Sequence, residues 1–219
     1  MTRRKLLWRI AAVLVAAPLL ILLALASPYF WSKAFEHNFH AVVPGRFYRS
    51  AEMPPDDLGR LIDEHGIKSV LDLRLSGDDP DAEGVREADV AARHGAQYRN
   101  VSMTSSRATQ RTRILKLLDA FDELPTPILV HCTSGSERSG VASAIWLMEK
   151  ERRPVDEARG QLALRYGFNE VERDLRCFFQ GEPTLDRIVS EYAKVRAGRE
   201  VSFRQWVAEA ELTADKPKR

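Results

Sequence analysis

A short strand, a cysteine-containing loop and a buried helix are predicted one after another between residues 127 and 147. The apolar run PILVHC predicts the strand, and the run GVASAIWL predicts the helix. The loop between them lies at the amino end of the helix, where unpaired backbone N–H groups and the helix dipole favour a negative charge. This order of elements predicts a binding site for an anion the size of phosphate.

Cys132 and Arg138 are the reactive side chains of this loop, which reads HCTSGSERSG over residues 131–140. The positive field at the helix end lowers the pKa of the Cys132 thiol, so that a nucleophilic thiolate is expected near neutral pH. The planar guanidinium of Arg138 can bind two phosphate oxygens at once and keeps its charge. Ser139 can donate a hydrogen bond to the sulfur of Cys132 when this sulfur has to leave.

The ten-residue segment resembles the His-Cys-x5-Arg-Ser/Thr motif of the cysteine-dependent protein phosphatases, and most closely that of the dual-specificity branch. Weaker similarities extend over about residues 38 to 175, in GRFYRSA at 45–51, HGIKSVLDLR at 65–74 and ALRYG at 163–167. The resemblance implies hydrolysis of a phosphomonoester through a cysteinyl-phosphate, with no cofactor and no metal ion.

The resemblance also implies a role for each residue of the loop. Cys132 would attack phosphorus, Arg138 would bind the phosphate and the transition state, Ser139 would assist the departure of the thiolate, and His131 would orient the loop. The loop residues expected to contact the substrate are Thr133, Ser134, Gly135, Ser136 and Glu137.

A general acid is missing from its expected place. In the related phosphatases an aspartate protonates the leaving oxygen from the loop after the strand that precedes the cysteine unit. Here that loop reads TSSRATQ over residues 104–110 and contains no carboxylate. The acid therefore stays unidentified, and the candidates elsewhere in the sequence are Glu137, Asp72 and the cluster Asp78, Asp79, Asp81 and Glu83.

The resemblance implies a protein tyrosine phosphatase of dual-specificity type that acts on a phosphorylated protein, and the sequence leaves alternatives open. The missing acid favours a catalytically weak protein that binds a phosphorylated ligand as a sensor. A sulfur-transfer or redox protein would also surround a cysteine with amides, although His131, Arg138 and Ser139 in register argue against it. The loop carries no lysine, which favours a monophosphate ester such as phosphotyrosine over a polyphosphorylated headgroup. A phospholipid or an envelope sugar phosphate is a further alternative.

The amino-terminal segment predicts a membrane anchor. Residues 10–26 are uncharged and would rise about 25 Å as a helix, which is near the lower limit for crossing a bilayer. Basic residues precede this run and only Lys33 follows nearby, so residues 6–26 are expected to span the inner membrane with the catalytic domain outside the cytoplasm. The small residues at 24–26 also suit cleavage of a signal peptide, which would release a soluble periplasmic protein.

The net charge and the cysteine content place few further constraints on the function. The 33 basic and 31 acidic residues give a formal net charge of +2. Four of the basic residues precede residue 10, so the rest of the sequence has a slight excess of acidic residues. This balance gives no electrostatic case for binding nucleic acid. The second cysteine, Cys177, lies in an apolar patch that is typical of a small core residue, and a disulfide with Cys132 is an alternative. The sequence predicts no oligomeric state.

Alternating strand and helix patterns predict an α/β three-layer sandwich with a largely parallel central sheet flanked by helices. Strands are predicted near 47–50, 68–74, 97–102 and 127–131. Helices are predicted near 55–65, 82–94, 110–123, 139–150, 154–166, 184–197 and 202–211. The expected organisation is a signal-anchor segment at 1–30, a phosphatase domain at 38–182, and a helical extension with a disordered tail at 183–219.

Overall fold

The computed structural model describes residues 16–17, 37–75, 86–104, 110–169, 187–198 and 200–209. The chain divides into two units, residues 1–36 and residues 37–219. Ala16 and Ala17, the described residues of the first unit, are helical. None of the helices within the described ranges is both long and apolar enough to cross a bilayer. The predicted anchor at 6–26 falls outside these ranges apart from the two alanines, as does Cys177.

The second unit is built on a five-stranded sheet with the strand order β1-β2-β5-β3-β4. The strands are β1 (His40–Val43), β2 (Phe47–Ala51), β3 (Ser69–Asp72), β4 (Gln97–Asn100) and β5 (Ile128–Cys132). Strands β2, β5, β3 and β4 pair in parallel, and β1 pairs with β2 in the antiparallel sense at one edge. Because parallel strands end at the same edge of a sheet, the loops after β2, β3 and β5 meet there.

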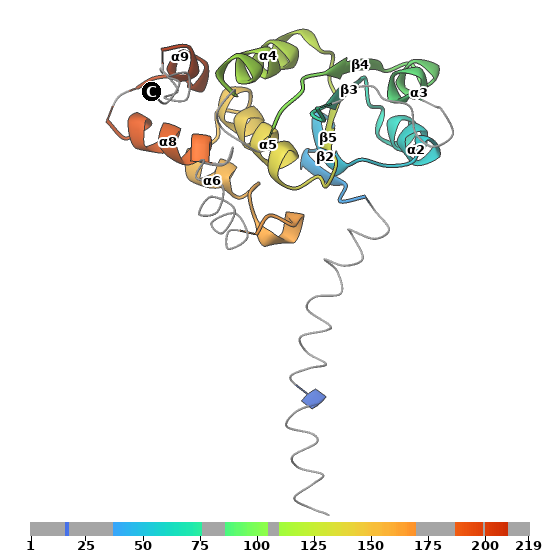
Figure 1. Cartoon of the computed structure of the whole chain (residues 1–219), viewed down its shortest axis with the longest axis horizontal. Helices are drawn as coiled ribbons and strands as arrows, with labels where there is room; N and C mark the ends of the chain where they lie inside the picture. Colours follow the sequence, from blue (N-terminus) through green and yellow to red (C-terminus); the bar gives the residue numbers. More distant parts are fainter. Residues whose placement is uncertain are drawn as a thin grey trace, which may run out of the picture. The chain divides into compact units, whose positions relative to one another are not determined.

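Helices cover both faces of the sheet (Figure 1). They are α2 (Pro55–His65), α3 (Glu87–Arg93), α4 (Gln110–Glu123) and α5 (Glu137–Glu149). Leu129 and Val70 point to the face covered by α2 and α3, while Leu71 and Val130 point to the face covered by α4 and α5. Successive strand residues therefore alternate between two apolar cores, which explains why the strands read as continuous apolar runs.

The carboxy-terminal part of the unit adds short helical elements. They are α6 (Val155–Arg159), the 3₁₀ turn η2 (Leu164–Tyr166), α8 (Arg187–Arg196) and α9 (Phe203–Glu209). Tyr192 of α8 and Phe203 of α9 are buried in the same core as α4 and α5. The Tyr192 hydroxyl donates to the carbonyl of Val201 at 2.7 Å, and a carboxylate oxygen of Glu149 in α5 accepts from the Phe203 amide at 2.7 Å. These contacts join the carboxy-terminal helices to α5.

The predicted α/β sandwich with a largely parallel sheet is confirmed for the described residues, with two differences. The edge strand β1 was not predicted. The predicted helix at 154–166 is wrong, because α6 ends at Arg159 and the chain turns before it forms η2. At this turn the carbonyl of Gln161 accepts a hydrogen bond from the guanidinium of Arg49 at 2.7 Å, so it does not serve a continuing helix.

Candidate functional site

The predicted cysteine loop joins the end of β5 to the start of α5. Cys132 is the last residue of β5, lies opposite Ala51 of β2 and is 1% exposed. Gly135 in the loop has a φ of 66°, and an added Cβ atom would lie 2.5 Å from the backbone nitrogen of Ala51. This position therefore requires glycine, both for its left-handed backbone and for its contact with β2. Residues 131–140 thus run from the end of β5 into the first turn of α5.

The pKa of the Cys132 thiol lies below its ordinary value. Burial raises this pKa, but hydrogen bonds from the side chain of Ser139 and the charge of Arg138 outweigh it. Backbone hydrogen bonds from Ser139 and Gly135 act in the same direction. Ser139 is fully buried, and its hydroxyl also lies 3.3 Å from the carbonyl oxygen of Ser50. The surroundings of the sulfur thus favour a thiolate, which is the nucleophilic form of cysteine.

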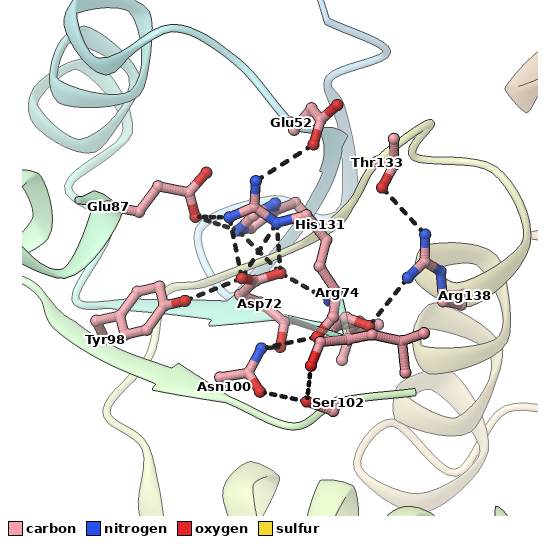
Figure 2. A network of polar contacts seen from close by, with 12 residues as sticks. Glu52, Asp72, Arg74, Glu87, Tyr98, Asn100, Ser102, His131, Thr133 and Arg138 are labelled. Atoms are coloured by element: carbon pink, nitrogen blue, oxygen red, sulfur yellow. Dashed lines mark hydrogen bonds and ion pairs between the residues drawn. The ribbon is translucent and has the colours of Figure 1, made fainter. Parts of the chain in front are cut away.

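Arg138 lies in the first turn of α5, beside the loop (Figure 2). Its guanidinium donates to the Thr133 hydroxyl at 3.2 Å and to the Leu73 carbonyl at 3.3 Å. The second contact ties the arginine to the chain just after β3. The guanidinium is thereby held over the loop that contains Cys132, in a position from which it could bind an anion.

His131 points away from the loop into a partly buried cluster of charged side chains (Figure 2). Its Nε2 atom lies 3.0 Å from a carboxylate oxygen of Glu87 and 3.9 Å from one of Asp72. Arg74 contacts the carboxylates of Asp72, Glu87 and Glu52, at 3.0, 2.8 and 3.2 Å respectively. The cluster joins the ends of β2, β3 and β5 to α3, directly behind the nucleophile.

The charges of this cluster stabilise one another. Burial lowers the pKa of His131, but the carboxylates of Glu87 and Asp72 outweigh burial and raise it. Burial raises the pKa of Asp72, but His131 and hydrogen bonds from Arg74 outweigh it and hold this pKa below its ordinary value. The Tyr98 hydroxyl donates to the same carboxylate at 2.9 Å. The two carboxylates thus favour the protonated form of His131, which suits an orienting residue better than a carrier of protons.

Asp72, Glu87 and His131 also form a possible set of metal ligands, with atoms within 4.8 Å of one another. The guanidinium of Arg74, however, already lies against both carboxylates. The cationic position between them is thus filled by a side chain of the protein, and we assign no metal ion to it.

The candidate acids differ in their surroundings. Asp72 is fully buried, and its lowered pKa makes it a poor proton donor. Glu137 is 7% exposed and is the first residue of α5, so it belongs to the loop itself. The acid-free loop at 104–110 is described only at Thr104 and in the backbone of Gln110, and the predicted cluster Asp78, Asp79, Asp81 and Glu83 lies outside the described residues.

No role is predicted from the sequence for three residues that contact the loop or His131. Glu87 pairs with His131, while Asn38 and Arg49 donate hydrogen bonds to loop carbonyls from outside. Arg49 lies inside the run FYRSA, where its apolar surroundings signal burial. A buried arginine in a strand is uncommon and needs partners, which is the signal that could have identified it. Asn38 and Glu87 lie in segments that carry no comparable signal.

A model of the tyrosine phosphatase family matches residues 35–150 of this chain, which include β1 to β5 and helices α2 to α5. This match spans more than half of the sequence and contains the whole cysteine loop. No curated protein matches the chain significantly.

Several solved structures resemble the chain. TpbA of P. aeruginosa in complex with pTyr is 18% identical, with a TM-score of 0.49, and the match covers 75% of this chain and 93% of that one. Tk-PTP in its active form is 16% identical, with a TM-score of 0.47 and coverage of 73% and 97%. The core catalytic domain of the PP-IP phosphatase SIW14 of S. cerevisiae is 21% identical, with a TM-score of 0.46 and coverage of 66% and 93%.

The lowered pKa of Cys132 predicts a thiol that reacts in the folded protein at a pH where free cysteine is protonated. The rate of alkylation by iodoacetamide is measured as a function of pH in a Cys177→Ser background. We expect the midpoint of this pH profile to lie at a lower pH than that of an ordinary thiol. The Ser139→Ala variant should shift the profile to higher pH, because it removes a hydrogen bond to the sulfur. A native profile identical to that of the denatured protein would contradict the described surroundings of the thiol.

Proposed function

The chain belongs to the tyrosine phosphatase family, and we propose that it hydrolyses phosphomonoesters with Cys132 as the nucleophile. The observation that carries this proposal is the environment of the thiol. The sulfur is buried in a loop whose backbone and side-chain donors, together with Arg138, hold its pKa below the ordinary value. A thiolate beside an arginine at the amino end of a helix can both bind a phosphate dianion and attack it.

The first step forms a cysteinyl-phosphate. The Cys132 sulfur attacks phosphorus in line with the ester oxygen, so that a sulfur–phosphorus bond forms as the phosphorus–oxygen bond breaks. The leaving oxygen takes a proton from a carboxyl group or from water. Arg138 and the loop amides bind the three remaining oxygens, over which charge is spread in the transition state.

The second step regenerates the thiolate. Water attacks phosphorus on the side opposite the sulfur, the sulfur–phosphorus bond breaks, and inorganic phosphate forms. The departing sulfur takes the electron pair of this bond, and the hydrogen bond from Ser139 stabilises the resulting negative charge. His131 supports the loop from behind through its pair with Glu87.

The proposed substrate is a monophosphate ester, with phosphotyrosine on a protein favoured, and the enzyme is proposed to be of dual-specificity type. The motif supports the subtype, and the loop residues that would face a substrate support the monophosphate. These residues carry one carboxylate and no lysine, so a second or third phosphate group would meet no cation from the loop other than Arg138. A phospholipid or an envelope sugar phosphate is the alternative substrate.

Substitution of the loop residues tests the mechanism. Cys132→Ser should abolish the release of p-nitrophenol from p-nitrophenyl phosphate, because the nucleophile is lost, while tungstate should still bind in a calorimetric titration. Arg138→Lys should lower kcat/KM about 100-fold, because one ammonium cannot replace the guanidinium fork. Arg60→Lys, at an exposed pair with Asp57 on α2, is the matched control and should retain activity. Near-normal turnover by Cys132→Ser would rule out the cysteinyl-phosphate.

A phosphate-binding sensor with negligible turnover is the second candidate function. The absence of a carboxylate from the loop at 104–110 favours it, because an unassisted leaving group departs slowly. Turnover by the wild type that is lost in Cys132→Ser would exclude it.

The identity of the acid can be tested with leaving groups of different basicity. Since Asp72 is held ionised and the loop at 104–110 has no carboxyl group, we expect kcat/KM, which reports the step that releases the phenol, to fall steeply as the pKa of the leaving phenol rises. A series of substituted aryl phosphates measures this slope. A flat slope would instead reveal an acid, and Glu137→Gln should then make it steep, whereas Glu64→Gln at an exposed position should not.

We further propose that residues 6–26 anchor the protein in the inner membrane, with the catalytic unit outside the cytoplasm. The basic residues before this segment and the uncharged run at 10–26 support this orientation. A reporter that is active only outside the cytoplasm, fused after Arg219, should be active, and the protein should stay with membranes after a high-salt wash. A soluble form that begins near Ser27 would show cleavage, and a cytoplasmic reporter would contradict the orientation.

A further inference from the structure

Three successive carbonyl groups of the cysteine loop accept hydrogen bonds from two buried side chains outside the loop. The side-chain amide of Asn38 donates to the Ser134 carbonyl at 3.1 Å. The Nη2 atom of Arg49 donates to the carbonyls of Gly135 and Ser136, at 2.7 and 2.9 Å. Asn38 is 1% exposed and Arg49 is fully buried. Water therefore has little access to the two contacts of Arg49, which are buried, while the contact of Asn38 with Ser134 is partly buried.

The direction of these carbonyls determines the direction of the loop amides. In a planar trans peptide, a carbonyl and the N–H of the next residue point to opposite sides. When the Ser134 carbonyl points outward to Asn38, the N–H of Gly135 points inward, and this N–H is one of the donors to the Cys132 sulfur. By the same geometry, the contact of Arg49 with the Gly135 carbonyl directs the N–H of Ser136 toward the inside of the loop. The Ser136 carbonyl also accepts from the Gly140 N–H of α5 at 3.0 Å, so Arg49 and the helix together orient the N–H of Glu137.

Arg49 is itself held from the opposite side. Its Nη1 atom donates to the backbone carbonyl of Gln161 at 2.7 Å and to the side-chain oxygen of Gln161 at 3.1 Å. The ring of Tyr166 lies 4.2 Å from the guanidinium carbon. The guanidinium thus bridges the cysteine loop and the segment after α6. Close packing leaves little freedom, since an added Cβ atom on Gly140 would lie 3.2 Å from Nη2.

The four described hydrogen-bond acceptors of Arg49 are neutral oxygens. Burial lowers the pKa of Arg49 to about 10, so the guanidinium is still charged at neutral pH. A buried cation whose described acceptors carry no charge is costly, and it is stabilised by a nearby anion. The Cys132 thiolate is such an anion, and its charge raises the pKa of Arg49. A bound phosphate dianion would add to the same attraction.

We propose that Arg49 is a positioning residue for the reaction: from outside the loop, it holds the carbonyls of Gly135 and Ser136 so that the following amides face the thiolate and the phosphate. Asn38 does the same for the amide of Gly135. The proposal rests on the proposed function, because it assigns Arg49 a part in binding the phosphate ester. Lysine cannot take this part, since one ammonium does not reach Gln161 and both loop carbonyls at once.

The test compares Arg49→Met, Arg49→Lys and Asn38→Ala in a Cys177→Ser background. In each folded Arg49 variant we expect the pKa of Cys132, from the pH profile of iodoacetamide alkylation, to rise. We expect kcat/KM for p-nitrophenyl phosphate to fall about 100-fold, because small misplacements of binding groups have effects of this size. The inhibition constant of inorganic phosphate should rise as well. Asn38→Ala should also raise the thiol pKa, because it frees the Ser134 carbonyl that orients the Gly135 N–H toward the sulfur. It should raise the inhibition constant of phosphate less than the Arg49 variants do, because two of the three carbonyls stay fixed.

Arg165→Met is the matched control. The Arg165 guanidinium lies 4.8 Å from the same Tyr166 ring and donates to Gly160, but it is exposed and has no described contact with the cysteine loop. This variant should keep the wild-type thiol pKa and the wild-type kcat/KM. Thermal unfolding and near-ultraviolet circular dichroism identify the variants that are folded.

The outcomes separate the two proposals. A folded Arg49→Lys with unchanged thiol pKa and unchanged phosphate inhibition overturns the positioning role, as does an equal effect of Arg165→Met. If Arg49→Met does not fold, Arg49→Lys and Asn38→Ala decide, and wild-type profiles in both overturn the role. If Cys132→Ser retains turnover, the mechanism is wrong, yet the alkylation profile still shows whether Arg49 sets the state of the thiol.

Discussion

The site depends on the orientation of a few peptide groups between the end of β5 and the start of α5. An anion can bind there only if the N–H groups of the loop point at it, and the helical bond from Gly140 to the Ser136 carbonyl orients only the end of the loop. The structure supplies that constraint from outside, through Asn38 and Arg49, and through the contact of Gly135 with Ala51. The strands of the parallel sheet serve this purpose, because β2 lies beside β5 and ends at the same edge.

A second set of buried charges lies on the other side of the nucleophile. His131, Asp72, Glu87 and Arg74 compensate one another, so that each ionised group has an opposite charge within reach. Removing one partner of such a set leaves an uncompensated buried charge, which is strongly destabilising. The cluster therefore fixes the end of β3 as well as His131, and the Leu73 carbonyl that contacts Arg138 follows directly after this strand. The position of the proposed phosphate-binding arginine is thus coupled to charges outside the cysteine loop.

The sequence predicts the parts of this protein that follow from local patterns. The apolar runs around Leu71 and Leu129 identify central strands, and the loop at 131–140 identifies the site, because each of these signals is contained in about ten consecutive residues. The partners of the loop could not be predicted in this way. Asn38, Arg49 and Gln161 are separated from it by many residues, and only the strand order brings them together. The same long-range contact explains the wrong helix at 154–166, since local propensity does not show that the Gln161 carbonyl is needed by Arg49.

The outward-held carbonyls have a consequence for the catalytic cycle. A loop that is fixed before the ligand arrives loses little conformational entropy on binding, so the site is preorganised for phosphate groups and its affinity for them is higher. Such a loop does not distinguish strongly between the phosphate of the ester and the free phosphate that remains after hydrolysis. We therefore expect a loop held in this way also to slow the departure of the product, so that turnover responds to the concentration of inorganic phosphate around the enzyme.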